Sequence, residues 1–109
     1  MSDLLAIVIP YYKKTFFRQT LQSLANQTDK RFRVYVGNDA SPENPSDLIE
    51  EFEGQFDLSY KKFNENLGGI SLVQQWHRCI DLVQDEEWLV VLGDDDMVDN
   101  KFVSSFYAS

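Results

Sequence analysis

The sequence predicts an α/β fold in which a mostly parallel sheet carries helices on both of its faces. Two observations lead to this prediction. Short apolar runs of strand length alternate along the chain with segments whose apolar residues recur at helical spacing, and such alternation is typical of parallel sheets. In addition, 43% of the 109 residues are hydrophobic and 14% are aromatic, which favours a packed core over disorder.

The first strand is expected over residues 4–9, a continuous apolar run that Pro10 ends, as in buried parallel strands. A helix is expected over residues 15–27, because its apolar residues recur at helical spacing and Thr15 can cap it. Residues 32–37 then form a second apolar run, which predicts the second strand.

After a polar loop, Ser46 is expected to cap a short helix over residues 46–53. The third strand is expected over residues 56–63, where the apolar alternation is less regular, and a longer helix over residues 70–83. We expect one side of this longer helix to be apolar, with the residues Leu72, Val73, Trp76, Cys79, Ile80 and Val83.

Residues 88–92 are all apolar and predict the fourth strand, which Gly93 ends. Asp99 is expected to cap a last helix that includes Phe102, Val103 and Phe106. Both tryptophans, Trp76 and Trp88, are interpreted as core residues. Because the sequence ends within or just after this last helix, we expect it to be a truncated part of a larger domain.

Composition excludes some classes of function. The formal net charge is −8 and the lysines and arginines are scattered, so a nucleic-acid partner is not expected. An acidic protein that binds an anionic ligand needs a local positive charge, commonly a divalent cation. The single cysteine, Cys79, forms no internal disulfide and suits a reducing cytoplasm. No apolar stretch is long enough to cross a bilayer, and the first residues do not resemble a secretory signal.

Polar and aromatic residues follow each of the four expected strands. Because ligands of open parallel sheets bind beyond the carboxyl ends of the strands, we expect these residues to converge on one edge. They are Pro10, Tyr11 and Tyr12 after the first strand, Asn38 and Asp39 after the second, residues 64–69 after the third, and Gly93 with Asp94, Asp95 and Asp96 after the fourth. This combination is plausible for a nucleoside diphosphate site.

The three consecutive aspartates carry most of this interpretation. Adjacent carboxylates repel one another unless water or a cation screens them, and Mg²⁺ and Mn²⁺ prefer oxygen ligands. An acidic surface loop is the alternative, but the position directly after a buried strand favours a metal site.

Each of the other candidate residues also has a purely structural alternative. Asp39 could form a turn or accept a hydrogen bond from a nucleobase N–H. Tyr11 and Tyr12 could be core residues, or one of them could stack on a base. Asn66 and Gly69 could form only a turn, or allow the backbone to approach ribose or phosphate.

Five segments in register resemble the family 2 glycosyltransferases, whose fold is the Rossmann-like GT-A nucleotide-diphospho-sugar transferase fold. The first segment, AIVIPYYK, resembles the family's VSVIIPTYN, and the last, LGDDD, resembles LDADD. The five segments are Ala6–Lys13, Leu21–Thr28, Val36–Ser41, Asn64–Gly69 and Leu92–Asp96. The resemblance covers essentially the whole chain and implies that residues 1–109 are an N-terminal nucleotide-sugar-binding part, without the acceptor-binding half.

The resemblance also implies roles for individual residues. Pro10 and Tyr12 would line the base pocket, and Asp39 would contact the base, typically uracil. Asn66 and Gly69 would lie near the ribose or the base. Asp94 would lie by the ribose and the metal, and Asp95 would bind the Mn²⁺ or Mg²⁺ ion that bridges the diphosphate of the donor.

The implied reaction is the metal-assisted transfer of a sugar from a nucleotide-diphospho-sugar, typically a UDP-sugar, to an acceptor hydroxyl with inversion. The general base is expected beyond Ser109. The acceptor is expected to be a carbohydrate or lipid-linked, in polysaccharide biosynthesis. The expected location is the cytoplasm or the inner face of the membrane, with peripheral membrane association of the full-length protein.

Departures from the family pattern leave the donor open. Asn38 replaces the first aspartate after the second strand, and Gly93 replaces the first aspartate of the acidic motif. The alternatives are a nucleotidylyltransferase, a phospho-accepting receiver module and a non-catalytic nucleotide-binding module. The first would need a glycine- and arginine-rich loop after the first strand, and the second would need carboxylates there, whereas this chain has tyrosines.

Overall fold

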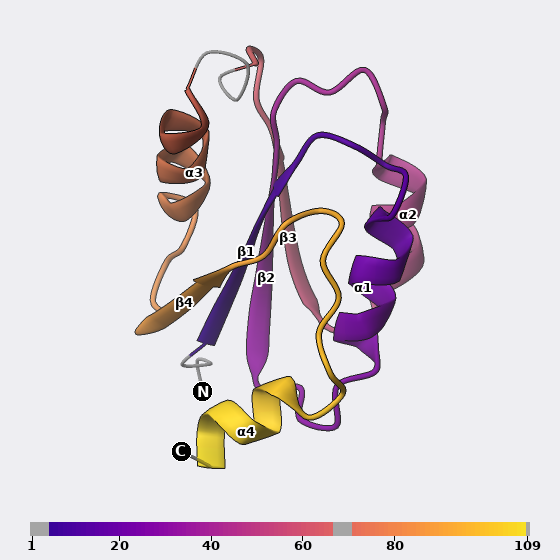
Figure 1. Ribbon diagram of the computed structural model, residues 1–109, viewed down its shortest axis with the longest axis vertical. Coiled ribbons are helices and arrows are strands. Elements are labelled where there is room, and N and C mark those ends of the chain that lie inside the picture. Colours follow the sequence, from indigo (N-terminus) through magenta and orange to yellow (C-terminus); the bar gives the residue numbers. More distant parts are fainter. Residues whose placement is uncertain (1–4, 67–70, 109) are drawn as a thin grey trace.

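The computed structural model describes residues 5–66 and 71–108, in which strands and helices alternate along the chain (Figure 1). The strands are β1 (Leu5–Tyr11), β2 (Phe32–Asn38), β3 (Asp57–Lys62) and β4 (Trp88–Val91). The helices are α1 (Phe17–Ala25), α2 (Ser46–Phe52), α3 (Leu72–Ile80) and α4 (Phe102–Ala108). The predicted order of eight elements is therefore confirmed.

The four strands form one parallel sheet in the order β3-β2-β1-β4. Leu5 is in register with Phe32 of β2 on one side and with Trp88 of β4 on the other. The chain thus adds β2 and β3 on one side of β1 and then returns to place β4 on the opposite side. The strand order reverses between β1 and β4, which is the position where open α/β sheets bind their ligands.

Helices cover both faces of the sheet, as the sequence predicts. Figure 1 shows α1 and α2 together on one face and α3 on the other. Helix α4 lies near the opposite end of the sheet from the tips of β1, β2 and β3. The buried side chain of Gln27, directly after α1, holds α4 by accepting the backbone N–H of Val103 and donating to the carbonyl oxygen of Asp99.

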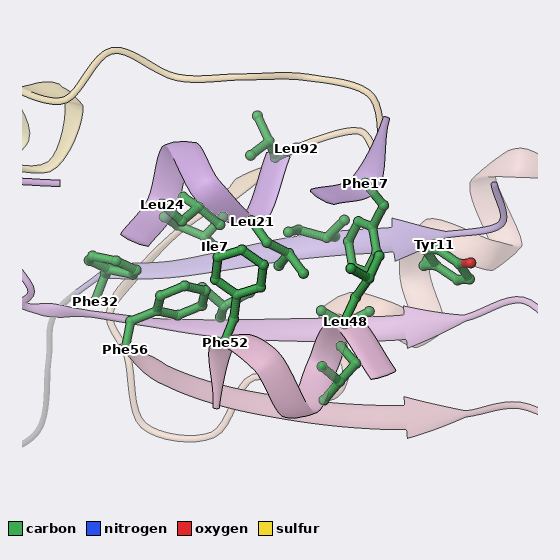
Figure 2. Packing of buried hydrophobic residues seen from close by; sticks show 14 of the residues in the cluster. Ile7, Tyr11, Phe17, Leu21, Leu24, Phe32, Leu48, Phe52, Phe56 and Leu92 are labelled. Carbon is green, nitrogen blue, oxygen red and sulfur yellow. The ribbon is translucent and has the colours of Figure 1, made fainter. Parts of the chain in front are cut away.

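The hydrophobic core lies between the sheet and the helices α1 and α2 (Figure 2). Every second residue of β1, beginning with Leu5, faces this core, because strand side chains alternate between the two faces. Helix α1 contributes three buried residues at helical spacing, Phe17, Leu21 and Leu24. Aromatic rings form part of the core, in which Phe56 packs against Phe32 and Phe52.

The side of helix α3 that packs on the sheet is not the apolar side predicted from the sequence. Its buried residues are Gln75 and Cys79, whereas Leu72, Val73 and Trp76 are exposed. The side-chain amide of Gln75 donates to the carbonyl oxygen of Gly37 and to Sγ of Cys79, so polar contacts with β2 accompany this orientation. The interpretation of Trp76 as a core residue is therefore wrong.

Trp88 is also exposed, which corrects its interpretation as a core residue. It begins β4, one of the two edge strands of the sheet among the described residues, and is 62% exposed. The strand itself is confirmed. A fully apolar run thus predicted the strand correctly but not its burial, because Leu89 is exposed as well and Val90 and Val91 are half-buried.

Two predicted helix caps are wrong by one residue. Helix α1 begins after Phe16 instead of Thr15, and helix α2 begins after Pro45 instead of Ser46, in both cases without a side-chain cap. Helix α3 does have one, because Ser71 Oγ accepts the backbone N–H of Gln74 at 3.2 Å. The predicted cap of the last helix is wrong too, because α4 begins only at Phe102 and Asp99 instead forms a turn by accepting the N–H of Lys101.

The described helices are all too short to cross a lipid bilayer.

Candidate functional site

A cavity of about 740 Å³ opens at the carboxyl ends of β1, β2 and β4, beside the first turns of α3. It lies where the strand order reverses, so the topology and the cavity indicate the same place. Its lining residues are Pro10, Tyr11, Tyr12, Asp39, Asn66, Leu72, Gln75, Trp76, Val91, Gly93, Asp94 and Asp96.

The structure brings five of the predicted site residues together around this cavity. They come from the carboxyl ends of all four strands and are Pro10, Tyr12, Asp39, Asn66 and Asp94. Of the other two, Gly69 lies outside the described residues, and Asp95 is exposed and does not line the cavity. The neighbouring Asp96, to which the sequence assigned no role, does line it.

Asp94 joins the loops that follow β1 and β4. Its Oδ2 atom accepts the backbone N–H groups of Tyr12 at 2.7 Å and of Lys13 at 2.8 Å. A carboxylate that accepts backbone N–H groups is strongly held, because charge-assisted hydrogen bonds are shorter and stronger than neutral ones. Asp94 therefore fixes Tyr12 beside the acidic loop.

The two tyrosines after β1 have different environments. Tyr11 is buried, its ring packs against Phe17, and its hydroxyl donates to the carbonyl oxygen of Glu43 at 2.7 Å. Burial, with a smaller contribution from the charges of Glu43 and Asp94, raises the pKa of Tyr11 to about 12, so it stays neutral near pH 7. Tyr12 is 39% exposed, which leaves its ring accessible to a ligand.

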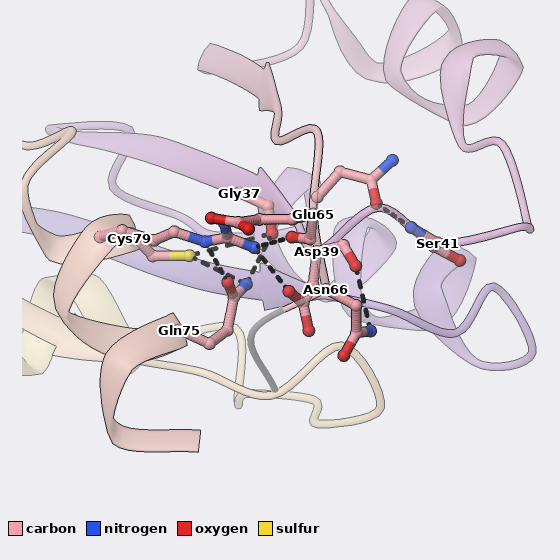
Figure 3. A network of polar contacts seen from close by, with 9 residues as sticks. Gly37, Asp39, Ser41, Glu65, Asn66, Gln75 and Cys79 are labelled. Atoms are coloured by element: carbon pink, nitrogen blue, oxygen red, sulfur yellow. Dashed lines mark hydrogen bonds and ion pairs between the residues drawn. The ribbon is translucent and has the colours of Figure 1, made fainter. Parts of the chain in front are cut away.

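Asp39 is held from several directions (Figure 3). Its backbone N–H donates to the carbonyl oxygen of Tyr11 at 3.0 Å, and its carbonyl oxygen accepts from the Nδ2 of Asn66 at 3.2 Å. Its carboxylate accepts from Nη2 of Arg78 at 2.5 Å. Asp39 thus links the loops that follow β1, β2 and β3, and its carboxylate has a fixed position.

Asn38, which departs from the family pattern, has a structural role. Its Nδ2 donates to the hydroxyl of Tyr60 at 2.8 Å, and its Oδ1 accepts the backbone N–H of Ser41 at 2.9 Å. The second bond closes a sharp turn in which Ala40 has a φ of 54°. The amide therefore shapes the loop that carries Asp39 without lining the cavity.

Sequence reasoning missed the contribution of α3 to the site. Gln75 and Trp76 line the cavity, and Arg78 reaches Asp39 from the same helix. A periodic apolar pattern cannot find such residues, since it marks Trp76 as core and gives no role to Gln75 or Arg78. The only available signal was that α3 follows the predicted ligand loop directly.

The acidic loop has the chemistry of a divalent cation site but is not a preformed cage of protein ligands. Asp94 accepts two backbone N–H groups through Oδ2, and Asp96 Oδ2 accepts the N–H of Gly93 at 2.9 Å. In the part of the chain that the structure describes, no three acidic, His or Cys side chains are grouped as metal ligands. Mg²⁺ commonly takes only one or two carboxylates and completes its shell with water and phosphates, so these residues fit such an ion.

Comparison with known proteins connects this geometry to a family. The family model described as "Glycosyl transferase family 2" matches residues 6–109. No match to this sequence was found among curated proteins.

Several crystal structures of TarS from S. aureus share the fold. The structure of TarS 1–349 in complex with UDP has 21% sequence identity and a TM-score of 0.85, and the match covers 99% of this chain and 31% of that chain. The same fragment in complex with UDP-GlcNAc matches with the same identity and TM-score and with 30% of that chain covered. This chain therefore spans about a third of the length of these TarS structures.

Proposed function

The chain belongs to glycosyl transferase family 2, and we propose that it forms the donor-binding part of an enzyme that transfers sugar from a UDP-sugar to an acceptor hydroxyl. One observation carries the proposal. Residues from the carboxyl ends of four strands converge on a single cavity at the point where the strand order reverses, namely Pro10, Tyr12, Asp39, Asn66 and Asp94. Aromatic, amide and carboxylate groups in one cavity suit a ligand that has a base, a ribose and phosphates.

In the proposed complex, the base lies between the loops after β1 and β2. The exposed ring of Tyr12 offers a flat apolar surface for stacking, with Pro10 beside it. The carboxylate of Asp39 accepts a hydrogen bond from a base N–H. Asn66, whose amide donates to the backbone carbonyl oxygen of Asp39, lies near the ribose in this complex, and so does Asp94.

The acidic loop is the proposed position of a Mn²⁺ or Mg²⁺ ion, with Asp94 and Asp95 as the protein ligands. When bound, the ion would offset the negative charge that develops on the departing nucleoside diphosphate. The protein residues contribute a fixed position, because Asp94 is already held by the backbone N–H groups of Tyr12 and Lys13.

The proposed reaction is a single displacement at the anomeric carbon. A bond forms from the acceptor oxygen to that carbon, the bond from the carbon to the diphosphate oxygen breaks, and the configuration inverts. A general base takes the hydroxyl proton. We place this base and the acceptor-binding surface beyond these 109 residues, so the chain alone is expected to bind nucleotide without appreciable turnover.

The proposed cellular setting is the cytoplasm, at the inner face of a membrane where a carbohydrate or lipid-linked acceptor of polysaccharide assembly would be glycosylated. A single free thiol, Cys79, is consistent with a reducing compartment.

Calorimetric titration with UDP, GDP and dTDP, each with and without Mn²⁺, tests the proposal. UDP is expected to bind, and Mn²⁺ is expected to tighten its binding. Asp94→Asn keeps a hydrogen-bond acceptor but loses the charge, so it should remove most of the effect of the metal. Asp85→Asn, an exposed carboxylate that does not line the cavity, is the matched control. Binding that is equally weak for all three nucleotides and insensitive to Mn²⁺ would contradict the proposal.

A further inference from the structure

Arg78 connects helix α3 to the end of strand β2 through the carboxylate of Asp39 (Figure 3). We propose that Arg78 is a positioning residue that sets the nucleobase selectivity of the site by holding the Asp39 carboxylate in place as a charged acceptor. This inference rests on the proposed function, because it assumes that Asp39 meets the base of a bound nucleotide.

The guanidinium group of Arg78 is itself fixed by four contacts. Nη2 donates to Oδ1 of Asp39 at 2.5 Å and to the carbonyl oxygen of Glu65 at 2.8 Å, and Nε donates to Oε1 of Gln75 at 2.6 Å. Its Cζ lies 4.0 Å from the centre of the Phe63 ring. Because the donors of arginine form a rigid planar fork, these contacts determine where the carboxylate of Asp39 is held.

The ion pair is largely removed from water. The side chain of Asp39 is 5% exposed and that of Arg78 is 17% exposed. Removing one partner of a buried ion pair leaves the other charge without compensation, which is strongly unfavourable. Arg78 therefore compensates the charge of Asp39 as well as fixing its orientation.

Arg78 acts on the ligand through Asp39. In the described part of the chain, Asp39 lines the cavity and Arg78 does not. A ligand in the cavity is therefore expected to contact Asp39 and not Arg78. Gln75 also lines the cavity and accepts from Arg78, so Arg78 is hydrogen-bonded to two residues that line the cavity.

A fixed carboxylate can distinguish uracil from cytosine by whether the ring nitrogen N3 carries a hydrogen. An ionised carboxylate can only accept hydrogen bonds. Uracil presents a ring N–H at N3, whereas the N3 atom of cytosine is an acceptor and would face the carboxylate with a lone pair. The wild-type site is thus expected to prefer UDP to CDP, and the preference is expected to depend on Arg78.

The test compares the UDP and CDP affinities of the full 109-residue chain, by calorimetry with Mn²⁺, in the wild type and in Arg78→Met and Arg78→Lys. The loss of a buried charged hydrogen bond predicts that Arg78→Met lowers the ratio of UDP to CDP affinity by about tenfold to a hundredfold. Arg78→Lys keeps the charge but not the fork, so it should recover part of the ratio. If Arg78→Met does not fold, Arg78→Lys still tests the proposal.

Arg18→Met is the matched control. Arg18 also pairs with a carboxylate, that of Glu51, and lies over an aromatic ring, that of Phe52, but on the exposed surface of α1 and α2. This substitution should leave both affinities unchanged.

A double-mutant cycle with Asp39→Asn separates positioning from a general structural role. If Arg78 acts through Asp39, Arg78→Met should change the UDP to CDP ratio in the wild type but not in the Asp39→Asn background. An unchanged ratio in Arg78→Met, or an equal loss of UDP and CDP affinity, would overturn the inference while the proposed function stands. A wild-type chain that binds neither nucleotide would contradict the proposed function and the inference together.

Discussion

Two side chains at the cavity have a structural role in addition to the ligand contacts that we propose for them. Asp94 accepts two backbone N–H groups of the loop after β1, and Asp39 ties the loop after β2 to helix α3. Alanine at either residue would release a loop as well as remove a ligand contact. Isosteric amides are therefore the informative substitutions, because asparagine keeps an acceptor oxygen in the same place.

The fluorescence of Trp76 can report whether a nucleotide binds in the cavity. Its side chain lines the cavity and is 42% exposed, whereas Trp88 lies at the start of β4, away from the carboxyl ends of the strands. These are the only two tryptophans in the chain. UDP with Mn²⁺ is expected to change the fluorescence of the Trp88→Phe variant, which keeps Trp76, and to leave that of Trp76→Phe unchanged. A response from Trp76→Phe alone would place the nucleotide elsewhere.

The thiol of Cys79 is expected to be unreactive in the folded protein. Burial raises the pKa of Cys79 to about 12, and the charge of Asp39 adds to this effect while that of Arg78 opposes it. Because only the thiolate attacks alkylating reagents, iodoacetamide at pH 8 should modify Cys79 much more slowly in buffer than in concentrated urea. Mass spectrometry measures the two rates. Equal rates would show that α3 does not bury this side chain.

Helix α3 approaches strand β2 closely at Gly37. A Cβ atom at this position would lie far inside van der Waals contact with Sγ of Cys79 and 3.0 Å from Cε2 of Phe63. Gly37→Ala is therefore expected to lower the free energy of unfolding by about 1–3 kcal/mol, the usual cost of overpacking. Urea unfolding measures the change.

Gly54, which follows α2, is the matched control for that substitution. A Cβ atom there would meet nothing within 4 Å. Gly54→Ala is expected to change the free energy of unfolding by no more than about 0.5 kcal/mol. If Gly37→Ala were as mild as Gly54→Ala, the close packing of α3 on β2 would be wrong.

At the scale of elements, the strands could be predicted well and the orientation of α3 could not. Continuous apolar runs identify both β1 and β4, and for β1 the reason is that a buried parallel strand needs apolar residues on both faces. Helix α3 follows a different rule. Its apolar residues Leu72, Val73 and Trp76 are exposed, and the side that packs on β2 is set by the contacts of Gln75 and Cys79. Such contacts depend on the neighbouring strand, so no periodic pattern in the sequence predicts them.

Helix starts illustrate the same difference over a shorter distance. Good capping residues at Thr15 and Ser46 predicted starts that lie one residue away in the structure. The helices α1 and α2 instead begin after Phe16 and Pro45, where no side-chain cap forms. Burial of the apolar side of each helix fixes these starts more strongly than a cap, whose contribution is only about 1 kcal/mol.

At the scale of the whole molecule, the position of the candidate site could be predicted because it follows from topology. In a parallel sheet the loops after the strands meet at one edge, whatever their separation in sequence. Five predicted residues from the carboxyl ends of four strands line one cavity in the structure. The partners that hold them, Arg78 above all, could not be predicted, because ion pairs between distant segments require the tertiary structure.

The most direct measurement is a crystal structure of the chain with UDP and Mn²⁺. We expect the uracil beside Tyr12 and Asp39, the ribose near Asn66, and the ion between the diphosphate and the carboxylates of Asp94 and Asp95. Nucleotide bound elsewhere, or an ion that contacts neither carboxylate, would contradict the assignment of this cavity as a sugar-nucleotide site.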